Sequence, residues 1–362
     1  MARPTRFHIH LDRLIHNFKV AQRLHGGRVL AVIKANAYGH GDVACAEALN
    51  SIADGFAVAT LEEAIHLRDA GIPGHILLLE GVFEKAEMRE AVTHNLTPVI
   101  HTPWQIGVLQ HTDFATPMPV WLKLDTGMHR LGFQPEELRE TYEMLRRIAH
   151  VGEITIMTHF ANADGADPEA IAEPMRQFHK ATQGLAVSTS LCNSGAILGH
   201  PAAYGDWARP GLMLYGIDPG VPAIRPRQAL QPVMRLTSEI SVIRMLAVGD
   251  AVGYGGLFKA QRPTRVGIIP CGYADGYPRS AAQGTPVAVA GTLVPLIGRI
   301  SMDMITVDLT EVPQIQPGAP VELWGDQVAV STVAQSAGTV AYEVLCHARR
   351  AEIQYHAVVR SS

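Results

Sequence analysis

The stretch AVIKANAYGHG at residues 31–41 begins as an apolar strand and then changes character. Ala, Val and Ile lead into Lys34, and polar and turn-forming residues follow it as far as Gly41. A single strand that ends on lysine usually begins a solvated surface loop. This stretch decides the fold because apolar runs that end in a polar residue recur along the chain.

Short apolar runs recur from about residue 29 to residue 216, with helical patterns between them. The eight runs are VLAVIKA, GFAVAT, HILLLE, LTPVI, VWLKLD, ITIMTHF, AVSTSLCN and RPGLMLYG. Most lack polar alternation, which is typical of parallel strands covered on both faces. They predict a (β/α)8 barrel, similar to a TIM barrel, over residues 8–229, and a doubly wound open sheet is the alternative. Between two of the runs, Thr60 and Glu63 match a helix capping box.

The alternation of apolar runs and helical patterns ends at about residue 230. Runs such as SEISVIRML, TPVAVAGTLVPLIG and MDMITVDL are rich in β-branched residues, are broken by Gly and Pro, and have little helix between them. They predict a separate all-β domain over residues 230–362. Near the N-terminus, FHIHL alternates as a strand does, so residues 1–11 can pair with either domain.

Composition limits the possible functions. The chain has 362 residues and a formal net charge of −4, without a basic cluster, which argues against general affinity for nucleic acid. No run of eighteen uncharged apolar residues predicts a membrane helix, and the N-terminus carries charge where a signal peptide needs an apolar core. The 4 cysteines show no CxxC pairing, so we expect reduced thiols and a cytoplasmic location.

Polar residues end all of the predicted barrel strands. They are Lys34, Thr60, Glu80, His101, Asp125, His159, Asn193 with Ser194, and Arg209. Catalytic residues of such barrels gather at the C-terminal ends of the strands. A lysine held there among other cations can lose its proton and form an imine with a carbonyl compound. The sequence contains no nucleophile elbow, HExxH zinc helix or Walker loop, so the residues favour Schiff-base chemistry. The commonest cofactor for that chemistry is pyridoxal phosphate, and we expect no bound metal.

A phosphate group needs a site of its own. In these barrels it usually lies in the loops after strands seven and eight, which here read CNSG and RPGLMLYG. We expect Asn193 and Ser194 at this site, where Ser194 supplies a hydroxyl. We also expect unobstructed backbone N–H groups at Gly195, Gly211 and Leu212.

Seven motifs together resemble the successive signatures of bacterial alanine racemase. They are AVIKANAYGHG, LKLDTGMHRLGF, THFANAD, NSGA, RPGLMLYG, GYADGYPR and GRISMDM, in that family's order. The resemblance implies a barrel, a C-terminal β domain and a homodimer with active sites at its interface. It also implies pyridoxal phosphate bound to Lys34, and racemisation of alanine by two bases, Lys34 and Tyr254 of the partner subunit.

The same resemblance implies roles for further residues. Cofactor contacts fall on Tyr38, His159, Ser194, Arg209, Gly211, Leu212 and Tyr342. Substrate contacts fall on Arg130 and Met302, and supporting or access-channel roles fall on Lys123, Tyr273, Arg279 and Asp303. Arg209 would face the pyridine nitrogen, where many other pyridoxal-phosphate enzymes place an acidic residue. Lys123 corresponds to a lysine that is carbamylated in some members.

Other functions are open on the sequence alone. A basic amino-acid decarboxylase has the same plan of a barrel and a β domain, but at the position of Arg209 it would be expected to carry an acidic residue. A racemase of broader specificity is closer, although such enzymes tend to be exported. A non-catalytic carrier of pyridoxal phosphate would need neither Tyr254 nor the β domain. We expect alanine as the substrate, with serine slower, because Tyr342 and Met302 match a bulky pair that limits the family's pocket.

Overall fold

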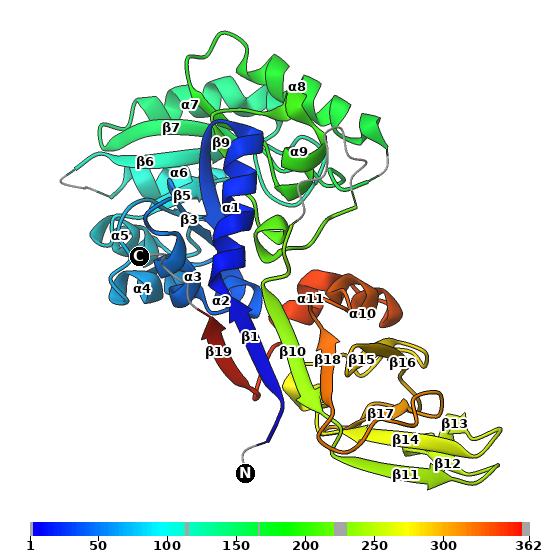
Figure 1. Cartoon of the computed structure of the whole chain (residues 1–362). Coiled ribbons are helices and arrows are strands. Elements are labelled where there is room, and N and C mark those ends of the chain that lie inside the picture. Colours follow the sequence, from blue (N-terminus) through cyan, green and yellow to red (C-terminus); the bar gives the residue numbers. More distant parts are fainter. Residues whose placement is uncertain (1–2, 113–115, 166, 221–229, 357–362) are drawn as a thin grey trace. The chain divides into compact units, whose positions relative to one another are not determined.

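A computed structural model describes residues 3–112, 116–165, 167–220 and 230–356 (Figure 1). The chain forms two compact units. The barrel unit contains Leu14–Ala37 and Gly41–Leu230, and the C-terminal unit contains Met1–Arg13, Tyr38–His40 and Gln231–Ser362. The domain boundary expected between residues 229 and 230 falls at the edge of residues 221–229, which lie outside the described residues.

The strands of the barrel unit close into a parallel barrel in the order β2-β3-β4-β5-β6-β7-β8-β9, which confirms the predicted architecture. They are β2 (Arg28–Val32), β3 (Gly55–Val58), β4 (Ile76–Leu78), β5 (Thr97–Ile100), β6 (Met118–Lys123), β7 (Val151–Met157), β8 (Ser188–Ser190) and β9 (Trp207–Ala208). The barrel closes where Val29 pairs with Ala208. Strands β3, β4 and β5 are buried along their whole length, as their continuous apolar runs predict.

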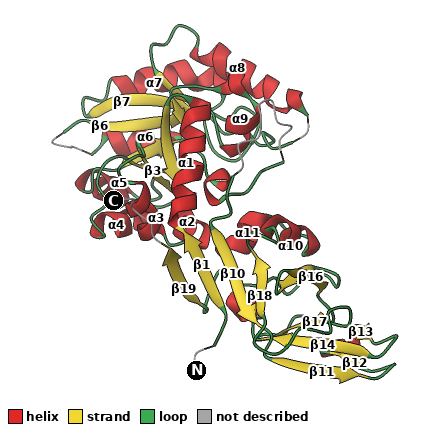
Figure 2. Ribbon diagram, in the orientation of Figure 1, coloured by secondary structure: helices red, strands yellow, loops and turns green. Residues whose placement is uncertain are grey.

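Helices surround these strands (Figure 2). They are α1 (Leu11–His25), α2 (Lys34–Gly39), α3 (Asp42–Leu49), α4 (Leu61–Asp69), α5 (Lys85–Thr93), α6 (Pro103–Gln110), α7 (Leu138–Arg146), α8 (Ala172–Thr182) and α9 (Ser194–Gly199). Short 3₁₀ helices are η1 (Pro135–Glu137), η2 (Pro168–Ile171), η3 (Pro201–Ala203) and η4 (Leu212–Tyr215). Helix α6 begins with a capping box between Thr102 and Gln105.

The capping box expected at α4 is absent. Thr60 occupies the N-cap position, but its side chain accepts no capping hydrogen bond. The Glu63 carboxylate binds the backbone N–H groups of Ala59 and Ala35 instead, each at 2.7 Å. The capping prediction was therefore wrong, because the folded barrel brings a donor from another segment within reach of Glu63.

The eighth strand also differs from the prediction. The run RPGLMLYG was expected to be a strand, whereas β9 ends before it and Leu212–Tyr215 form η4. Pro210 has no N–H for a strand ladder, and Gly211 (φ −119°, ψ −83°) turns the chain out of the extended conformation. Tyr215 then anchors η4 to the barrel, since its hydroxyl donates to the Val32 carbonyl at 2.9 Å.

The described residues of the C-terminal unit form three sheets. Its six-stranded sheet has the order β16-β15-β18-β10-β1-β19, beside a three-stranded sheet β11-β14-β17 and a pair β12-β13. Strand β1 (Arg6–His10) pairs antiparallel with β10 and parallel with β19. The remaining strands are β10 (Met234–Glu239), β11 (Val242–Leu246), β12 (Ala251–Val252), β13 (Phe258–Lys259), β14 (Thr264–Ile269), β15 (Pro286–Val289), β16 (Thr292–Pro295), β17 (Ile305–Asp308), β18 (Pro320–Trp324) and β19 (Glu352–His356). Short helices are η5 (Tyr254–Gly256), η6 (Tyr273–Asp275), α10 (Val330–Ser336) and α11 (Ala341–Cys346).

Two broader expectations concern thiols and membranes. No disulfide joins the four cysteines, all of which lie in described residues. Within the described ranges, no helix is long and apolar enough to cross a membrane.

Candidate active site

Lys34 lies just beyond β2 and is followed by a turn of unusual hand. Residues Ala35 to Tyr38 have φ angles of 53°, 54°, 51° and 52°, so four consecutive non-glycine residues are left-handed. This conformation costs an L-residue roughly 1–2 kcal/mol. Such strain persists only where the surrounding structure holds it, and it clusters at functional sites. The turn therefore marks Lys34 independently of its position at a strand end.

Cationic side chains gather at the same end of the barrel. Burial, together with the charges of Arg130 and Arg209, lowers the pKa of Lys123 to about 8, and Lys34 adds to the effect. Burial and the same set of cations lower the pKa of His159 to about 3. The His159 ring is therefore neutral near pH 7, and these five side chains are close enough to influence one another.

Arg209 is the most deeply buried of these cations, with 4% of its surface exposed. Its guanidinium donates to the Thr158 carbonyl at 2.6 Å and to the Ser190 hydroxyl. Burial lowers its pKa to about 10, so it stays protonated at neutral pH. Among the described residues, no carboxylate forms an ion pair with it. Ser190 and Thr158 were not predicted, and their only signal was a polar residue in a barrel strand or directly after one.

The loop after β6 carries Arg130. Asp125 accepts hydrogen bonds from the N–H groups of Gly127 at 3.0 Å and His129 at 2.9 Å. Burial would raise the pKa of Asp125, but these hydrogen bonds and His129 outweigh it and hold the pKa below its usual range. The loop then returns to the strand, where the Phe133 N–H donates to the Lys123 carbonyl at 2.9 Å. This closed loop keeps Arg130 near Lys123.

Two other predicted strand-end residues bind each other. The His101 ring donates to the Glu80 carbonyl at 2.9 Å. Burial is the main cause that lowers the pKa of His101, and Lys123 contributes. These groups stabilise the rim of the barrel rather than extend the cationic cluster.

The loops after β8 and β9 are joined by Ser194. Its Oγ accepts the N–H groups of Gly211 at 3.0 Å and Met213 at 3.2 Å. The Gly211 N–H, expected to be unobstructed, is thus already bonded, and the Ser194 hydroxyl hydrogen is the donor that can face a ligand. Asn193 caps α9 by accepting from the Ala196 N–H at 3.0 Å. Its own amide donates to the Phe160 carbonyl at 3.3 Å, so it positions the loop.

The other predicted site residues belong to the C-terminal unit. Tyr38 is buried and its ring lies 5.9 Å from that of Tyr342. Burial raises the pKa of Tyr38, so it remains a neutral phenol. Tyr254 is 69% exposed on η5, and Met302 is 51% exposed. Tyr273, Arg279 and Asp303 are exposed as well.

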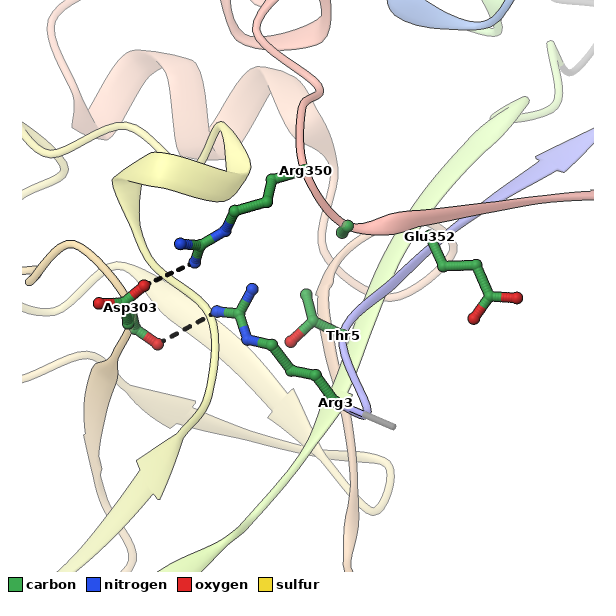
Figure 3. Close-up of a pocket in the computed structure, with 6 residues that line it drawn as sticks. Arg3, Thr5, Asp303, Arg350 and Glu352 are labelled. Carbon is green, nitrogen blue, oxygen red and sulfur yellow. Dashed lines mark hydrogen bonds and ion pairs between the residues drawn. The ribbon is translucent and has the colours of Figure 1, made fainter. Parts of the chain in front are cut away.

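Asp303 forms part of an ionic network with two arginines. Figure 3 shows Arg3 and Arg350 directed toward it beside a cavity of about 430 Å³. Arg350 pairs with the Asp303 carboxylate at 2.7 Å, and Arg3 donates to the Asp303 carbonyl at 3.3 Å. Both arginines also bind Asp275, whose side chain is fully buried. Their hydrogen bonds hold the pKa of Asp275 below its usual range despite the burial.

Asp275 connects this network to the predicted substrate and channel residues. The turn around it is the 3₁₀ helix η6, and Gly276 follows with φ 108°. The N–H groups of Tyr273 and Ala274 donate to the carbonyls of Ser301 and Met302, each at 3.1 Å. These two hydrogen bonds hold the backbone at Tyr273 against the backbone at Met302. Sequence reasoning gave Asp275 no role, because its partners are far away along the chain.

The chemistry of the barrel site suits pyridoxal phosphate. An amine at Lys34 can bond to its aldehyde, the Ser194 hydroxyl can donate to its phosphate, and the excess of cations favours an anionic ligand. Arg209 adds a buried donor that no carboxylate in the described part of the chain balances.

Two family models match the chain: "Alanine racemase, N-terminal domain" over residues 9–219 and "Alanine racemase, C-terminal domain" over residues 233–355. Curated relatives include the alanine racemase of Azoarcus sp., 52% identical over 98% of this chain and 99% of its own length. The catabolic alanine racemase of Pseudomonas putida is 50% identical over the same shares. The biosynthetic alanine racemase of Pseudomonas aeruginosa superposes with a TM-score of 0.93, at 43% identity over 98% of this chain and 100% of that one.

Proposed function

The chain belongs to the alanine racemase family, and from this premise we propose that it interconverts L-alanine and D-alanine with pyridoxal phosphate as its cofactor. The observation that carries the proposal is the cationic barrel mouth. There Lys34 lies within electrostatic reach of Lys123 and His159, together with a buried arginine that no described carboxylate neutralises.

Pyridoxal phosphate supplies electron withdrawal, which acidifies the Cα–H of an amino acid bound to it. Lys34 would hold it by its aldehyde, and Ser194 by its phosphate. Sequence motifs add Gly211, Leu212, Tyr38 and Tyr342 to the phosphate contacts. The hydrogen bond from Gly211 to Ser194 supports this set, because it orients the hydroxyl hydrogen away from the backbone.

Arg209 would direct the chemistry toward racemisation. A guanidinium is a donor only and cannot take up a proton from a ring nitrogen. If it faces the cofactor's ring nitrogen, Arg209 would leave that nitrogen unprotonated, and the cofactor would then supply weaker electron withdrawal than beside an acidic residue. Competing transamination and decarboxylation are then less favoured. Neutral His159 beside it adds no further charge.

Inversion at Cα requires proton transfer on both faces of the substrate. We assign the two transfers to Lys34 Nζ and to the phenol oxygen of Tyr254 of the partner subunit. The exposure of Tyr254 supports this assignment, because a residue offered to a second chain must lie on the surface of its own. A homodimer with shared active sites follows from the assignment.

The substrate would be held by its carboxylate. Arg130, which the Asp125 loop keeps at the mouth of the barrel, supplies the cation, and the Met302 backbone N–H supplies a second donor. Tyr342 and Met302 would restrict the pocket to a methyl side chain, with serine accepted more slowly.

Incubating the purified protein and pyridoxal phosphate with L-alanine in D2O tests the proposal. We expect D-alanine that carries solvent deuterium at Cα, and loss of this activity in Lys34→Ala. Release of CO2 from a basic amino acid would identify a decarboxylase instead. Binding of pyridoxal phosphate without turnover would identify a carrier.

A further inference from the structure

Glu63 connects two segments of the barrel through its carboxylate. One oxygen accepts the backbone N–H of Ala35, and the other accepts the backbone N–H of Ala59, each at 2.7 Å. Ala35 directly follows Lys34, and Ala59 directly follows β3. A side chain on α4 thus ties the residue after the predicted cofactor lysine to the end of the neighbouring strand.

The segment held in this way is the left-handed turn. Its later part has its own hydrogen bonds: the Ala37 N–H donates to the Ile33 carbonyl at 2.8 Å, and the Gly41 N–H donates to the Asn36 carbonyl at 3.0 Å. Glu63 supplies the bond at the entrance of the turn, next to Lys34. Because L-residues disfavour this conformation, its entrance needs such support.

The alternatives for Glu63 do not match its contacts. It does not form the capping box, since Thr60 makes no capping bond. It forms no ion pair within the described part of the chain, so it is not half of a surface salt bridge. One of its oxygens binds a backbone donor from another segment, Ala35, and the other binds the N–H of Ala59, two residues before α4. A carboxylate bonded in this way fixes the geometry of the two backbones.

We propose that Glu63 is a positioning residue that fixes the backbone at Ala35, and so holds Lys34 in the orientation in which it retains pyridoxal phosphate. This inference rests on the proposed function for the role of Lys34. The chemistry requires a carboxylate, because two N–H groups need two acceptors. A glutamine would offer one acceptor and one NH2 donor, and the donor would oppose one of the N–H groups.

Glu63→Gln tests the inference, with Glu62→Gln as its matched control. Glu62 precedes it in the first turn of α4 and is exposed, so the control removes the same charge from the same helix end. Two quantities are measured. One is the rate at which the protein loses pyridoxal phosphate on dilution, followed by absorbance. The other is hydrogen exchange of the Ala35 and Ala59 amides in cofactor-free protein.

We expect Glu63→Gln to lose cofactor about tenfold faster than wild type, and its Ala35 or Ala59 amide to exchange at least tenfold faster. Glu62→Gln should match wild type in both. Equal behaviour of the two variants, or faster cofactor loss with unchanged exchange at both amides, would overturn the inference. Should Glu63→Gln not fold, Glu63→Asp provides the same test, since its shorter side chain cannot reach both amides.

Failure of the proposed function gives a different result. Wild-type protein would then not racemise alanine, whether it binds pyridoxal phosphate or not. The exchange comparison needs no cofactor, so it reports on Glu63 in either case.

Discussion

The Arg209 guanidinium donates a hydrogen bond to the backbone carbonyl of Thr158, with a nitrogen–oxygen distance of 2.6 Å. A second hydrogen bond from the same guanidinium reaches the Ser190 hydroxyl. Arg209 is thereby fixed by neutral acceptors from two neighbouring barrel segments, and its charge remains available to a ligand.

Arg209→Glu should lower the rate of racemisation more than tenfold and increase the share of transamination. The reason is that an acid can hold a proton against the cofactor nitrogen, whereas a guanidinium cannot accept one. The ratio of D-alanine to pyruvate formed from L-alanine measures the partition. Arg209→Lys, which keeps the positive charge, should give the same ratio of D-alanine to pyruvate as the wild type. An unchanged ratio in Arg209→Glu would contradict the proposed role.

Lys123→Met should stabilise the cofactor-free protein at pH 7. Burial and neighbouring cations lower the pKa of Lys123 from 10.5 to about 8 in the folded state. Below about pH 8 the native protein carries this penalty in full, roughly 3 kcal/mol at about 1.4 kcal/mol per unit. The penalty disappears as pH rises toward 10.5, because lysine then becomes neutral in both states. Denaturant unfolding at several pH values measures the free energy of unfolding of variant and wild type. If the difference between these two free energies does not narrow as the pH rises toward 10.5, the prediction is wrong.

His159→Gln should leave the shape of the pH–rate profile unchanged between about pH 5 and 9. Burial, Arg209 and Lys123 lower the pKa of His159 to about 3, so its ring does not titrate in that range. We expect kcat/KM to fall by about tenfold at all pH values, the effect of one lost contact of about 1.4 kcal/mol. A limb near pH 6.5 in the wild type that vanishes in the variant would show that His159 does titrate there.

Asp275→Asn should destabilise the protein by about 2 kcal/mol, between the values typical of buried and surface ion pairs. The carboxylate is fully buried and binds both Arg3 and Arg350, which are partly exposed. Asp303→Asn, at a side chain that is 53% exposed, should cost less than about 1 kcal/mol. Urea unfolding compares the two variants. Equal losses would mean that Asp275 is not the centre of the network.

Mixing two inactive variants should restore activity if Tyr254 acts across a dimer. Lys34→Ala and Tyr254→Phe chains, refolded together in equal amounts, form mixed dimers in which one site has both wild-type residues. Activity should recover to about a quarter of the wild-type value for random assembly of a twofold dimer. No recovery, in samples whose mixed dimers are verified by mass, would place both residues in the same chain's site.

The sequence by itself predicted a closed barrel for this unit, with a doubly wound open sheet as the alternative, and the structure confirms the barrel. Strands buried on both faces need continuous apolar runs, and those runs are visible in the sequence. Because the C-terminal ends of parallel strands meet at one mouth, the positions of Lys34, His159 and Arg209 at strand ends already predict a common site. Their influence on one another's charge in the folded protein agrees with that assignment.

Local patterns were less reliable where two conformations share the same residues. The run LMLY at residues 212–215 is equally apolar as a strand or as a 3₁₀ helix, and Pro210 with Gly211 decided for the helix. The hand of the turn after Lys34 was likewise not visible, since Ala35 and its neighbours carry no glycine or proline signal for a left-handed conformation.

Tertiary structure alone decided which polar groups bind each other. Glu63 meets Ala35 across 28 positions of sequence, and Asp275 joins Arg3 to Arg350 across the length of the chain. Periodicity in a sequence reports which side chains are buried, because burial repeats with the helix or strand. A hydrogen bond depends instead on which donor lies within about 3 Å of an acceptor after folding, and only the packed chain determines that distance.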